Sequence, residues 1–434
     1  MRNLRELLLW IPSLLLASGA AVAPAFDWSY EYPAGEINTC VEADPVHARV
    51  FVGTVEGFHY LDVPSGEWTS RDEEGWIGRQ VWSLAWHPEQ DARVITGREN
   101  AFFKGYIELS EDLGIGGDIV YSSPAGSVTG LARDPHHADR FYACTWSDVV
   151  SGEIVRSLDG GLHWSPLTGT IHYAMTGISV DPDGVVYAAG SSQVTRSLDG
   201  GDTWEPAAGG LPPDYGIYCV AADPDLSGHL LVSNDLALYE TSNGGEAWTE
   251  ILPASCRRIA WGGTWATVPG GTEYCFVAAT TWDGRVLVSR DGGAEWQEET
   301  GDLLGEPVDL AFVPVAGRLE LFVATERDGI YRALVLDPAG TPGSVGRAVV
   351  LRLRCPAPFR PGNELRFVLP ERGDMTLELL DVAGRSLQRI AEGRFAAGEH
   401  RLAWNAPACA PGVYFVRLHG SVGETTARLV LIER

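Results

Sequence analysis

The sequence is short of basic charge, and above all of lysine. Lys104 is the single lysine among 434 residues, and 32 basic side chains stand against 58 acidic ones, for a net charge of −26. Such a surface repels nucleic acids and anionic lipids, so neither is an expected partner. The acidic excess would suit a cationic ligand or Ca²⁺, and it also keeps an exported protein soluble. We expect no cofactor, with Ca²⁺ as the one candidate ion.

Long apolar runs are also scarce. Residues 7–16 form one, broken by a proline and a serine, and it lies between two arginines and the small-residue sites Ala21-Val22-Ala23 and Ala23-Pro24-Ala25. This order is typical of a signal peptide, which we assign to residues 1–25. A cut after Ala25 is favoured, because a cut after Ala23 would leave proline at the next position. The run is short for an uncleaved membrane anchor, and no other stretch approaches a span. We therefore expect a secreted or bacterial cell-surface protein.

The seven cysteines form no metal-binding pattern. No Cys-x-x-Cys pair occurs, and none of the cysteines stands with histidines at zinc-ligand spacing, so no metal site is predicted. Export permits disulfides, and the pairs to test are Cys256 with Cys275 and Cys355 with Cys409. The alternative is that most of these cysteines are small buried apolar residues.

Four segments align without gaps on Asp/Asn-Gly-Gly-x-x-Trp: RSLDGGLHW (156–164), RSLDGGDTW (196–204), ETSNGGEAW (240–248) and VSRDGGAEW (288–296). The acid or amide can accept backbone hydrogen bonds in a hairpin turn, the glycines supply positive φ, and the tryptophan can fold back over the turn. The pattern resembles the Asp-box, or BNR, repeat of sialidases, sortilin-type receptors, xyloglucan-active endoglucanases and a photosystem assembly factor. The resemblance implies a structural role, away from the functional face, for Asp159, Trp164, Asp199, Trp204, Asn243, Trp248, Asp291 and Trp296.

A second repeat sets the number of structural units. Apolar strands end in Asp-Pro, or in a remnant of it, at residues 45, 88, 135, 182, 224, 263 and 314. Seven repeats of this length predict an all-β fold, a seven-bladed β-propeller over residues 26–338. Blades one, two and seven lack a good copy of the Gly-Gly pattern. Blade seven offers three strands before the linker at 339–348, so residues 26–32 are expected to supply its fourth strand.

Residues 349–434 follow a different pattern. Seven short alternating strands separated by Gly, Pro and Asn predict an immunoglobulin-like β-sandwich. The strings APFRPGNELRFVLPERGDMTLELLDVAGRSLQRI, GEHRLAWN, APGVYFVRLHG and TARLVLIER resemble C-terminal sorting domains of type IX secretion. They resemble equally the Ig-like domain of the flagellar hook capping protein FlgD. The resemblance implies recognition by outer-membrane secretion machinery, removal of the domain and surface attachment; the alternative is a passive accessory module.

No catalytic motif accompanies the repeats. Sialidases with this repeat also carry a Phe/Tyr-Arg-Ile-Pro motif near the first blade, and the one Phe-Arg-Pro string here lies at 359–361, in the C-terminal domain. Xyloglucanases of this kind usually have two propellers facing a cleft, whereas this chain has one. GxSxG, HExxH and a Gly-rich phosphate loop are also missing. A glycoside hydrolase, sialidase-like or xyloglucanase-like, is therefore the alternative, and it would need two acids with perturbed pKa in an aromatic-lined cleft.

Acids and two tryptophans converge on one rim of the predicted ring. The turns between second and third strands share a face with the loops that start each blade, and they carry Glu56, Glu99, Trp146, Asp148, Asn234, Asp235, Trp282, Asp283, Glu326 and Arg327. Such a rim could bind a sugar by stacking and hydrogen bonds, or a cation. The alternative is ordinary solvated turn residues. His136 and His137 lie in the opposite loops and are expected to be exposed.

These patterns together favour a binding module over an enzyme. The repeats are explained by a structural role, and no catalytic motif was found, so we expect a monomeric extracellular protein that binds a glycan or a protein. An assembly factor like the photosystem one is disfavoured by the sorting-like tail and by the missing basic patch. Propellers host unrelated functions, so the fold by itself does not choose between these possibilities.

Overall fold

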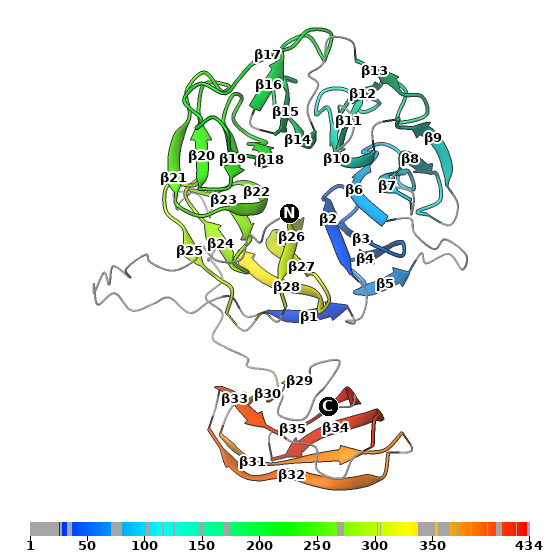
Figure 1. Ribbon diagram of the computed structural model, residues 1–434, viewed down its shortest axis with the longest axis vertical. Coiled ribbons are helices and arrows are strands. Elements are labelled where there is room, and N and C mark those ends of the chain that lie inside the picture. The colour runs from blue at the N-terminus through cyan, green and yellow to red at the C-terminus, as the bar shows by residue number, and fades with distance from the viewer. Residues whose placement is uncertain are drawn as a thin grey trace, which may run out of the picture.

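Seven four-stranded antiparallel sheets surround a common centre (Figure 1). The computed structural model describes residues 26–431 except 27, 33–36, 71–79, 101–103, 115–116, 125, 147–151, 168–173, 192, 267–272, 302, 304, 337–351, 355–363, 370–371, 383, 397, 405–409 and 422. The innermost strand of each sheet contacts the innermost strands of both neighbouring sheets. This part of the chain is therefore a seven-bladed β-propeller, as the repeat spacing predicted. None of the described segments forms a helix long and apolar enough to cross a membrane.

The first six blades each consist of four consecutive strands. Blades 1 to 3 contain β2 (Asn38–Asp44), β3 (Arg49–Thr54), β4 (Phe58–Asp62) and β5 (Glu67–Ser70); β6 (Gln80–Trp86), β7 (Val94–Glu99), β8 (Gly105–Ser110) and β9 (Asp118–Ser122); and β10 (Ser127–Arg133), β11 (Phe141–Trp146), β12 (Ile154–Ser157) and β13 (Ser165–Pro166). Blades 4 to 6 contain β14 (Met175–Val180), β15 (Val186–Gly190), β16 (Gln193–Ser197) and β17 (Glu205–Pro206); β18 (Ile217–Ala222), β19 (Leu230–Asn234), β20 (Leu238–Thr241) and β21 (Thr249–Leu252); and β22 (Cys256–Ala266), β23 (Glu273–Thr281), β24 (Val286–Ser289) and β25 (Gln297–Glu298).

Blade 7 joins the two ends of the propeller. Its sheet order is β1-β28-β27-β26, formed by β26 (Pro307–Val315), β27 (Arg318–Thr325), β28 (Gly329–Leu336) and the N-terminal β1 (Ser29–Tyr32). β1 pairs antiparallel with β28, so the prediction that the N-terminal segment supplies the missing outer strand is confirmed. Trp28, just before β1, is fully buried in the core of blades 6 and 7. Its indole N–H donates to the Glu299 carbonyl at 2.8 Å.

All seven inner strands carry a β-bulge at the same position. The bulged residues are Thr39, Trp82, Thr129, Thr176, Tyr218, Arg257 and Val308. A bulge leaves one residue outside the ladder and redirects its side chain. Three of these side chains tie their strand to the next blade: the hydroxyl of Thr39 donates to the Val81 carbonyl, that of Thr129 to the Met175 carbonyl at 2.9 Å and that of Thr176 to the Ile217 carbonyl at 2.7 Å.

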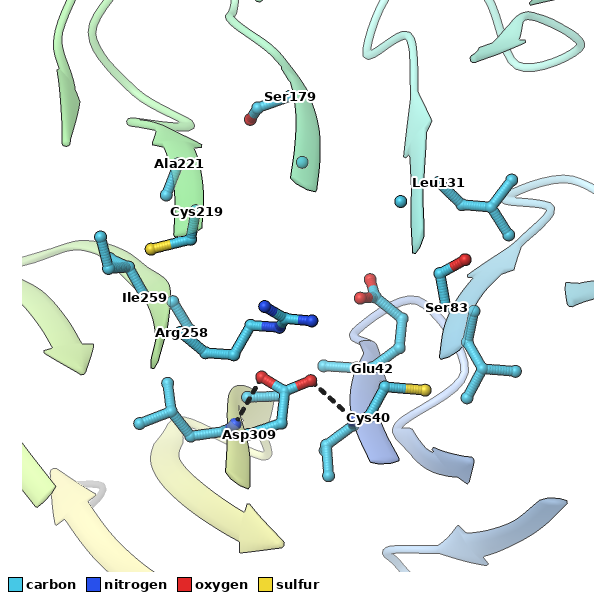
Figure 2. A pocket seen from close by; sticks show the side chains of 18 of the residues that line it. Cys40, Glu42, Ser83, Leu131, Ser179, Cys219, Ala221, Arg258, Ile259 and Asp309 are labelled. Carbon is cyan, nitrogen blue, oxygen red and sulfur yellow. Dashed lines mark hydrogen bonds between the residues drawn. The ribbon is translucent and has the colours of Figure 1, made fainter. Parts of the chain in front are cut away.

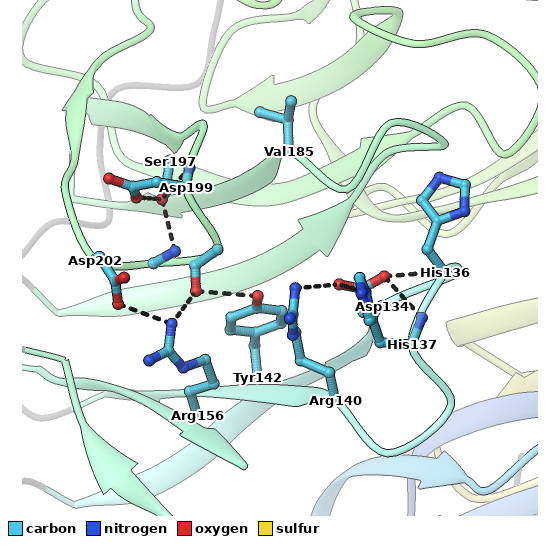
Figure 3. Close-up of polar contacts among 12 residues, drawn as sticks. Asp134, His136, His137, Arg140, Tyr142, Arg156, Val185, Ser197, Asp199 and Asp202 are labelled. Atoms are coloured by element: carbon cyan, nitrogen blue, oxygen red, sulfur yellow. Dashed lines mark hydrogen bonds and ion pairs between the residues drawn. The ribbon is translucent and has the colours of Figure 1, made fainter. Parts of the chain in front are cut away.

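The four Gly-Gly segments close one kind of turn between the third and outer strands. In blade 4 the Asp199 carboxylate accepts from the Thr203 N–H and the Ser197 hydroxyl, both at 2.8 Å, and Ser197 accepts from the Gly201 N–H at 2.7 Å (Figure 3). Gly200 and Gly201 have φ of 74° and 102°, which glycine adopts without steric cost. The same bonds recur in blades 3, 5 and 6, with a threonine in the serine's place in blade 5.

The tryptophans of these segments cover their turns. The indole N–H groups of Trp164, Trp204 and Trp296 donate to the carbonyl of the second glycine of their own segment, at 2.8 to 3.0 Å. Trp248 differs, because its indole N–H donates at 2.8 Å to Ala207, which follows the outer strand of the preceding blade. In three blades the bond braces a turn, and in the fourth it joins two blades.

Blade 2 carries a degenerate turn of the same kind, which the sequence pattern did not reveal. The Ser110 hydroxyl donates to Asp112 at 2.8 Å and accepts from the Gly114 N–H at 2.6 Å. Leu113 and Gly114 have φ of 57° and 84°, in the places of the two glycines. The sequence match was not recognised because leucine stands where the other segments have glycine, and a non-glycine residue in the left-handed region is uncommon. The turn geometry therefore persists in a blade that was expected to lack a good copy.

Arginines connect the turns of blades 4 and 5 to the preceding blade. Arg156 of blade 3 donates from Nη1 to the Gly200 carbonyl at 2.6 Å and to the Asp202 carboxylate at 2.9 Å (Figure 3). Arg196 repeats the first contact one blade later, donating to the Gly244 carbonyl at 2.9 Å. Each arginine directly precedes the serine of its own blade's turn, so one repeat supplies both a turn and the contact that anchors the next.

The Asp-Pro turns follow the inner strands, at the opposite end from the bulges. They also have a structural role. The carboxylate of Asp134, which is buried, accepts from the His136 N–H at 2.8 Å and from Arg140 Nη1 at 3.1 Å (Figure 3). His136 and His137 are both exposed, as the sequence predicted. The imidazole Nδ1 of His137 lies 3.2 Å from the Asp134 carboxylate.

The C-terminal part of the chain is a two-layer β-sandwich. One sheet contains β29 (Arg352–Arg354), β30 (Glu364–Leu369) and β33 (Gly398–Ala403), and the other contains β31 (Gly373–Leu380), β32 (Ser386–Phe395), β34 (Gly412–Gly420) and β35 (Gly423–Leu431). Leu365 and Phe367 of the first sheet share one apolar core with Leu377 and Val416 of the second. Seven alternating strands were predicted here, and the described residues of this part form seven.

Cys256 and Cys275, one of the two pairs singled out for testing, do not form a disulfide. All five cysteines that the structure describes are free thiols. The register of β22 and β23 sets Cys256 opposite Thr281 and Cys275 opposite Thr264, so the two cysteines lie toward opposite ends of the hairpin. Burial raises the pKa of Cys256 to about 12, which keeps its thiol protonated and unreactive. Cys355 and Cys409 lie outside the described residues.

Trp28 is expected to be essential for closing the ring. Replacing it with alanine should lower the free energy of unfolding of the propeller by about 3–5 kcal/mol, the usual loss for a fully buried tryptophan. Tyr30→Ala is the matched control, because Tyr30 lies in the same strand but is 46% exposed. Denaturant unfolding followed by tryptophan fluorescence measures both, and equal losses for the two variants would show that closure does not depend on the buried ring.

Candidate functional site

Because the four strands of each blade run antiparallel, every second connection lies on the same face of the ring, here called the rim face. It carries the turns between second and third strands and the connections that lead into each inner strand. The structure brings three of the predicted rim residues together at blades 5 and 6, namely Asp235, Trp282 and Asp283. Asp148 lies outside the described residues.

Trp282 is the centre of the rim cluster, which we define as Tyr218, Asp235, Arg257, Trp282 and Glu306. The Trp282 side chain is 48% exposed. The Tyr218 ring meets it edge-on, with centroids 5.3 Å apart, and Arg257 Cζ lies 4.9 Å from its ring centroid. Glu306 holds the arginine through an Oε1–Nη1 contact of 3.3 Å. Trp282 is therefore fixed in orientation while half of its surface remains open to solvent.

The acids around Trp282 already have partners. The Tyr218 hydroxyl and the Gly216 N–H, the latter at 3.1 Å, both donate to the Asp235 carboxylate. The bond to Asp235 raises the pKa of Tyr218 to about 12, so the phenol stays a donor at neutral pH. Asp283 accepts two bonds from Arg285 Nε, at 2.9 and 3.0 Å. Burial by itself would raise the pKa of Asp283, but these bonds outweigh it and lower the pKa below its ordinary value.

The other predicted rim residues are spread over further blades. Glu99 is buried, and its carboxylate accepts from the Trp82 indole N–H at 2.9 Å and from the Ser127 hydroxyl at 2.5 Å. It thereby joins blade 2 to blade 3. The remainder are at least partly exposed: Glu56 in blade 1, Trp146 in blade 3, and Glu326 and Arg327 in blade 7.

A second candidate site is the central channel, a cavity of about 480 Å³ lined by all seven inner strands (Figure 2). The residue after each bulge occupies an equivalent place along the channel, and in the first five blades it is small: Cys40, Ser83, Gly130, Gly177 and Cys219. Blades 6 and 7 place Arg258 and Asp309 there instead. The channel is therefore charged on one side.

Glu42 extends this charge further along the channel. Glu42 lies two residues after Cys40, the residue that follows the bulge. At the equivalent position the other six blades carry alanine or serine: Ala85, Ala132, Ser179, Ala221, Ala260 and Ala311. Arg258 points its guanidinium into the channel toward the Glu42 carboxyl, with Asp309 beside it (Figure 2). The Asp309 carboxylate is fixed by the N–H groups of Val41 and Leu310, at 2.9 and 2.8 Å.

The channel changes the acidity of both carboxyl groups. Burial, followed by repulsion from Asp309, raises the pKa of Glu42 to about 8, against an opposing effect of Arg133. Burial also raises the pKa of Asp309, against the attraction of Arg258. Glu42 is thus mainly a neutral hydrogen-bond donor at pH 7, because a buried carboxyl loses less by keeping its proton than by ionising.

The residues that organise both sites were not predicted from the sequence. Tyr218 and Arg257 are bulged residues of inner strands, and Glu42, Arg258 and Asp309 interrupt a pattern of small residues. Aligning the seven inner strands position by position would have exposed all five, because each departs from its equivalents. The prediction relied on turns, where nearly every residue is polar and a charge carries little information. Within the described ranges, no three His, Cys, Asp or Glu side chains are grouped as metal ligands would be.

Comparisons with known proteins support the fold. No protein-family model matches the chain, and no curated protein matches it. Among solved structures the chain is similar to "YCF48 bound to D1 peptide", with a TM-score of 0.51, 17% sequence identity, and coverage of 73% of this chain and 100% of that one. Identity at this level shows the fold alone. The fold is that of a β-propeller, a fold that hosts unrelated functions.

Glu42 makes the stability of the propeller depend on pH. Its pKa is about 8 in the folded protein against 4.5 for the free side chain, so the unfolded chain releases this proton first. The free energy of unfolding should therefore fall as pH rises from about 4.5 to 8. Glu42→Gln, which carries no titrating proton, should remove part of that slope and stabilise the protein at pH 8.

Chemical denaturation at several pH values measures this slope. The exposed Glu56→Gln is the matched control for the loss of one carboxyl group. Part of the slope should survive in Glu42→Gln, because the pKa of Asp309 is also raised. An unchanged slope in Glu42→Gln would show that Glu42 ionises freely in the folded channel.

Proposed function

We propose that this protein is a secreted or cell-surface binding module that recognises an exposed polypeptide segment at the rim cluster. The observation that carries the proposal is Trp282, half exposed and held between Tyr218 and Arg257. Tryptophan, tyrosine and arginine are the residue types most enriched where protein interfaces gain their binding energy. A side chain that is already fixed loses little entropy on binding, so it makes an effective anchor.

The hydrogen-bonding state of the rim cluster favours a polypeptide over a glycan. A sugar site needs acceptors free to bind hydroxyl groups beside the aromatic ring, whereas Asp235 and Asp283 are engaged by Tyr218, Gly216 and Arg285. Leu236 and Tyr215 add exposed apolar surface in blade 5. The solved structure of the similar propeller is titled as bound to a peptide, which is in keeping with a polypeptide partner.

The charge of the chain suggests the character of that partner. A net charge of −26 attracts cationic segments over a distance of about one Debye length and accelerates their association. We therefore expect the bound segment to combine an apolar anchor for Trp282 with flanking basic residues. Its affinity should fall as salt is raised.

Selection from a displayed random-peptide library against the chain from residue 26 tests this function. Enriched peptides should be basic, and Trp282→Ala should weaken them about 30-fold or more, as for an interface residue worth 2 kcal/mol. Trp146→Ala is the matched control, since Trp146 is 38% exposed but lies in blade 3. Peptides that bind wild type and Trp282→Ala equally would contradict the site. Binding on a parallel glycan array that is lost in Trp282→Ala would make the ligand a glycan.

Export through the C-terminal domain is the second part of the proposal. It is supported by the signal-peptide pattern at 1–25 and by the resemblance of residues 349–434 to type IX sorting domains. Attaching residues 349–434 to a periplasmic reporter in a host with that secretion machinery should carry the reporter to the cell surface or the medium. A reporter that remains in the periplasm would leave the domain as an accessory module.

A glycoside hydrolase remains the second candidate, and one observation favours it. Glu42 and Asp309 are two carboxyl groups with raised pKa in one channel, whose lining includes Trp82, Trp86 and Trp261. A carboxyl with a raised pKa can act as a general acid toward a glycosidic oxygen. Both oxygens of Asp309 already accept a backbone N–H, which leaves fewer positions for an attacking water, and this weakens the case.

Product analysis on a panel of polysaccharides tests the hydrolase. Cleavage that is lost in both Glu42→Gln and Asp309→Asn, and kept in Trp282→Ala, would place an enzyme in the channel. The absence of products with any member of the panel would leave the binding function alone. The two candidates use different residues, so one set of variants separates them.

A further inference from the structure

The Glu299 side chain anchors the start of the N-terminal strand. It follows β25 in blade 6, and its carboxylate is 3% exposed. Both of its oxygens are engaged, Oε1 by Arg290 Nη2 at 2.9 Å and Oε2 by the backbone nitrogen of Phe26 at 2.8 Å. Its own carbonyl accepts from the Trp28 indole at 2.8 Å. One residue of blade 6 thus binds two residues of the segment that completes blade 7.

The side chain of Phe26 is also held in place. It is 3% exposed and packs edge-on against Trp28, with ring centroids 5.9 Å apart. Arg290 Cζ lies 5.5 Å from the Phe26 ring centroid, so one arginine contacts both the ring and the carboxylate that binds its nitrogen. A buried carboxylate is costly unless it is paired and hydrogen-bonded. Here it is aimed at the nitrogen of one particular residue.

That nitrogen belongs to the residue directly after the favoured cleavage site, Ala23-Pro24-Ala25. We propose that cleavage after Ala25 creates an α-ammonium group on Phe26, that this group forms a buried ion pair with Glu299, and that the ion pair locks β1 into blade 7. Export processing then completes the closure of the ring. The inference rests on the signal peptide and is independent of what the propeller binds.

The chemistry needs only water and a signal peptidase. Hydrolysis breaks the Ala25–Phe26 peptide bond; the Ala25 carbonyl carbon takes the hydroxyl, and the Phe26 nitrogen takes the proton. The released amine, with an ordinary pKa near 8, gains a further proton at neutral pH and becomes an ammonium. A hydrogen bond to the Glu299 carboxylate in which only the acceptor is charged is thereby replaced by one in which donor and acceptor carry opposite charges.

The test compares two N-termini, each with the wild-type Glu299 side chain and with its substitution. One chain starts at Phe26, released from a fusion by a protease that leaves no extra residue, and the other retains Pro24-Ala25. The chain that starts at Phe26 should melt about 2–4 °C higher in the propeller transition. Glu299→Gln should abolish that difference. Glu298→Gln, an exposed neighbour in β25, is the matched control and should preserve it. Equal melting temperatures for the two N-termini with wild-type Glu299 would overturn the proposal.

Two further measurements do not depend on the variants folding. N-terminal sequencing of the secreted protein should read Phe26, and a start at any other residue would overturn the proposal. Acetylating the α-amino group of the wild-type chain should lower the melting temperature to that of the extended form. The chain has a single lysine, Lys104, so mass spectrometry can separate the effect of the N-terminal label from side reactions. An acetylated chain that melts like the unmodified one would also contradict the ion pair.

Discussion

The pairing of β1 with β28 is the interaction on which the rest of the propeller depends. Each blade buries both of its faces against neighbours, so a ring left open between blades 7 and 1 would expose two apolar faces and an unpaired edge. β1 is only four residues long, and Trp28 and Glu299 hold it from the side of blade 6. Both candidate sites draw on blade 7, which this closure completes: the rim cluster spans blades 5 to 7, and the charged wall of the channel spans blades 6, 7 and 1.

The two sites share a second constraint, the bulge at the same place in every inner strand. Repeating a bulge seven times gives each blade one side chain outside the ladder, and small residues fill most of the positions that follow it. Against that regular background Tyr218, Arg257, Arg258 and Asp309 stand out. Function in this fold is carried by departures from the repeat, whereas the repeat itself carries packing.

That division explains what could be read from the sequence. The Gly-Gly segments and Asp-Pro strand ends predicted seven blades, the N-terminal closing strand and the separate sandwich, because turn geometry and period-two alternation are local. The sequence could not decide whether Cys256 pairs with Cys275, because the register within a hairpin is not readable from cysteine spacing. Asp235, Trp282 and Asp283 were predicted on one rim, but Tyr218 and Arg257, which hold Trp282, lie on different strands and meet it only once blades 5 and 6 are folded and packed.

The outer strands have a further consequence, for behaviour at high concentration. β13, β17 and β25 are two residues long, and the first two end in proline. A free strand edge recruits other chains when it is long and offers a row of backbone donors, and proline offers none. At these three blades the edge of the ring therefore gives a second molecule almost nothing to extend, so these edges resist edge-to-edge polymerisation by shape as well as by charge.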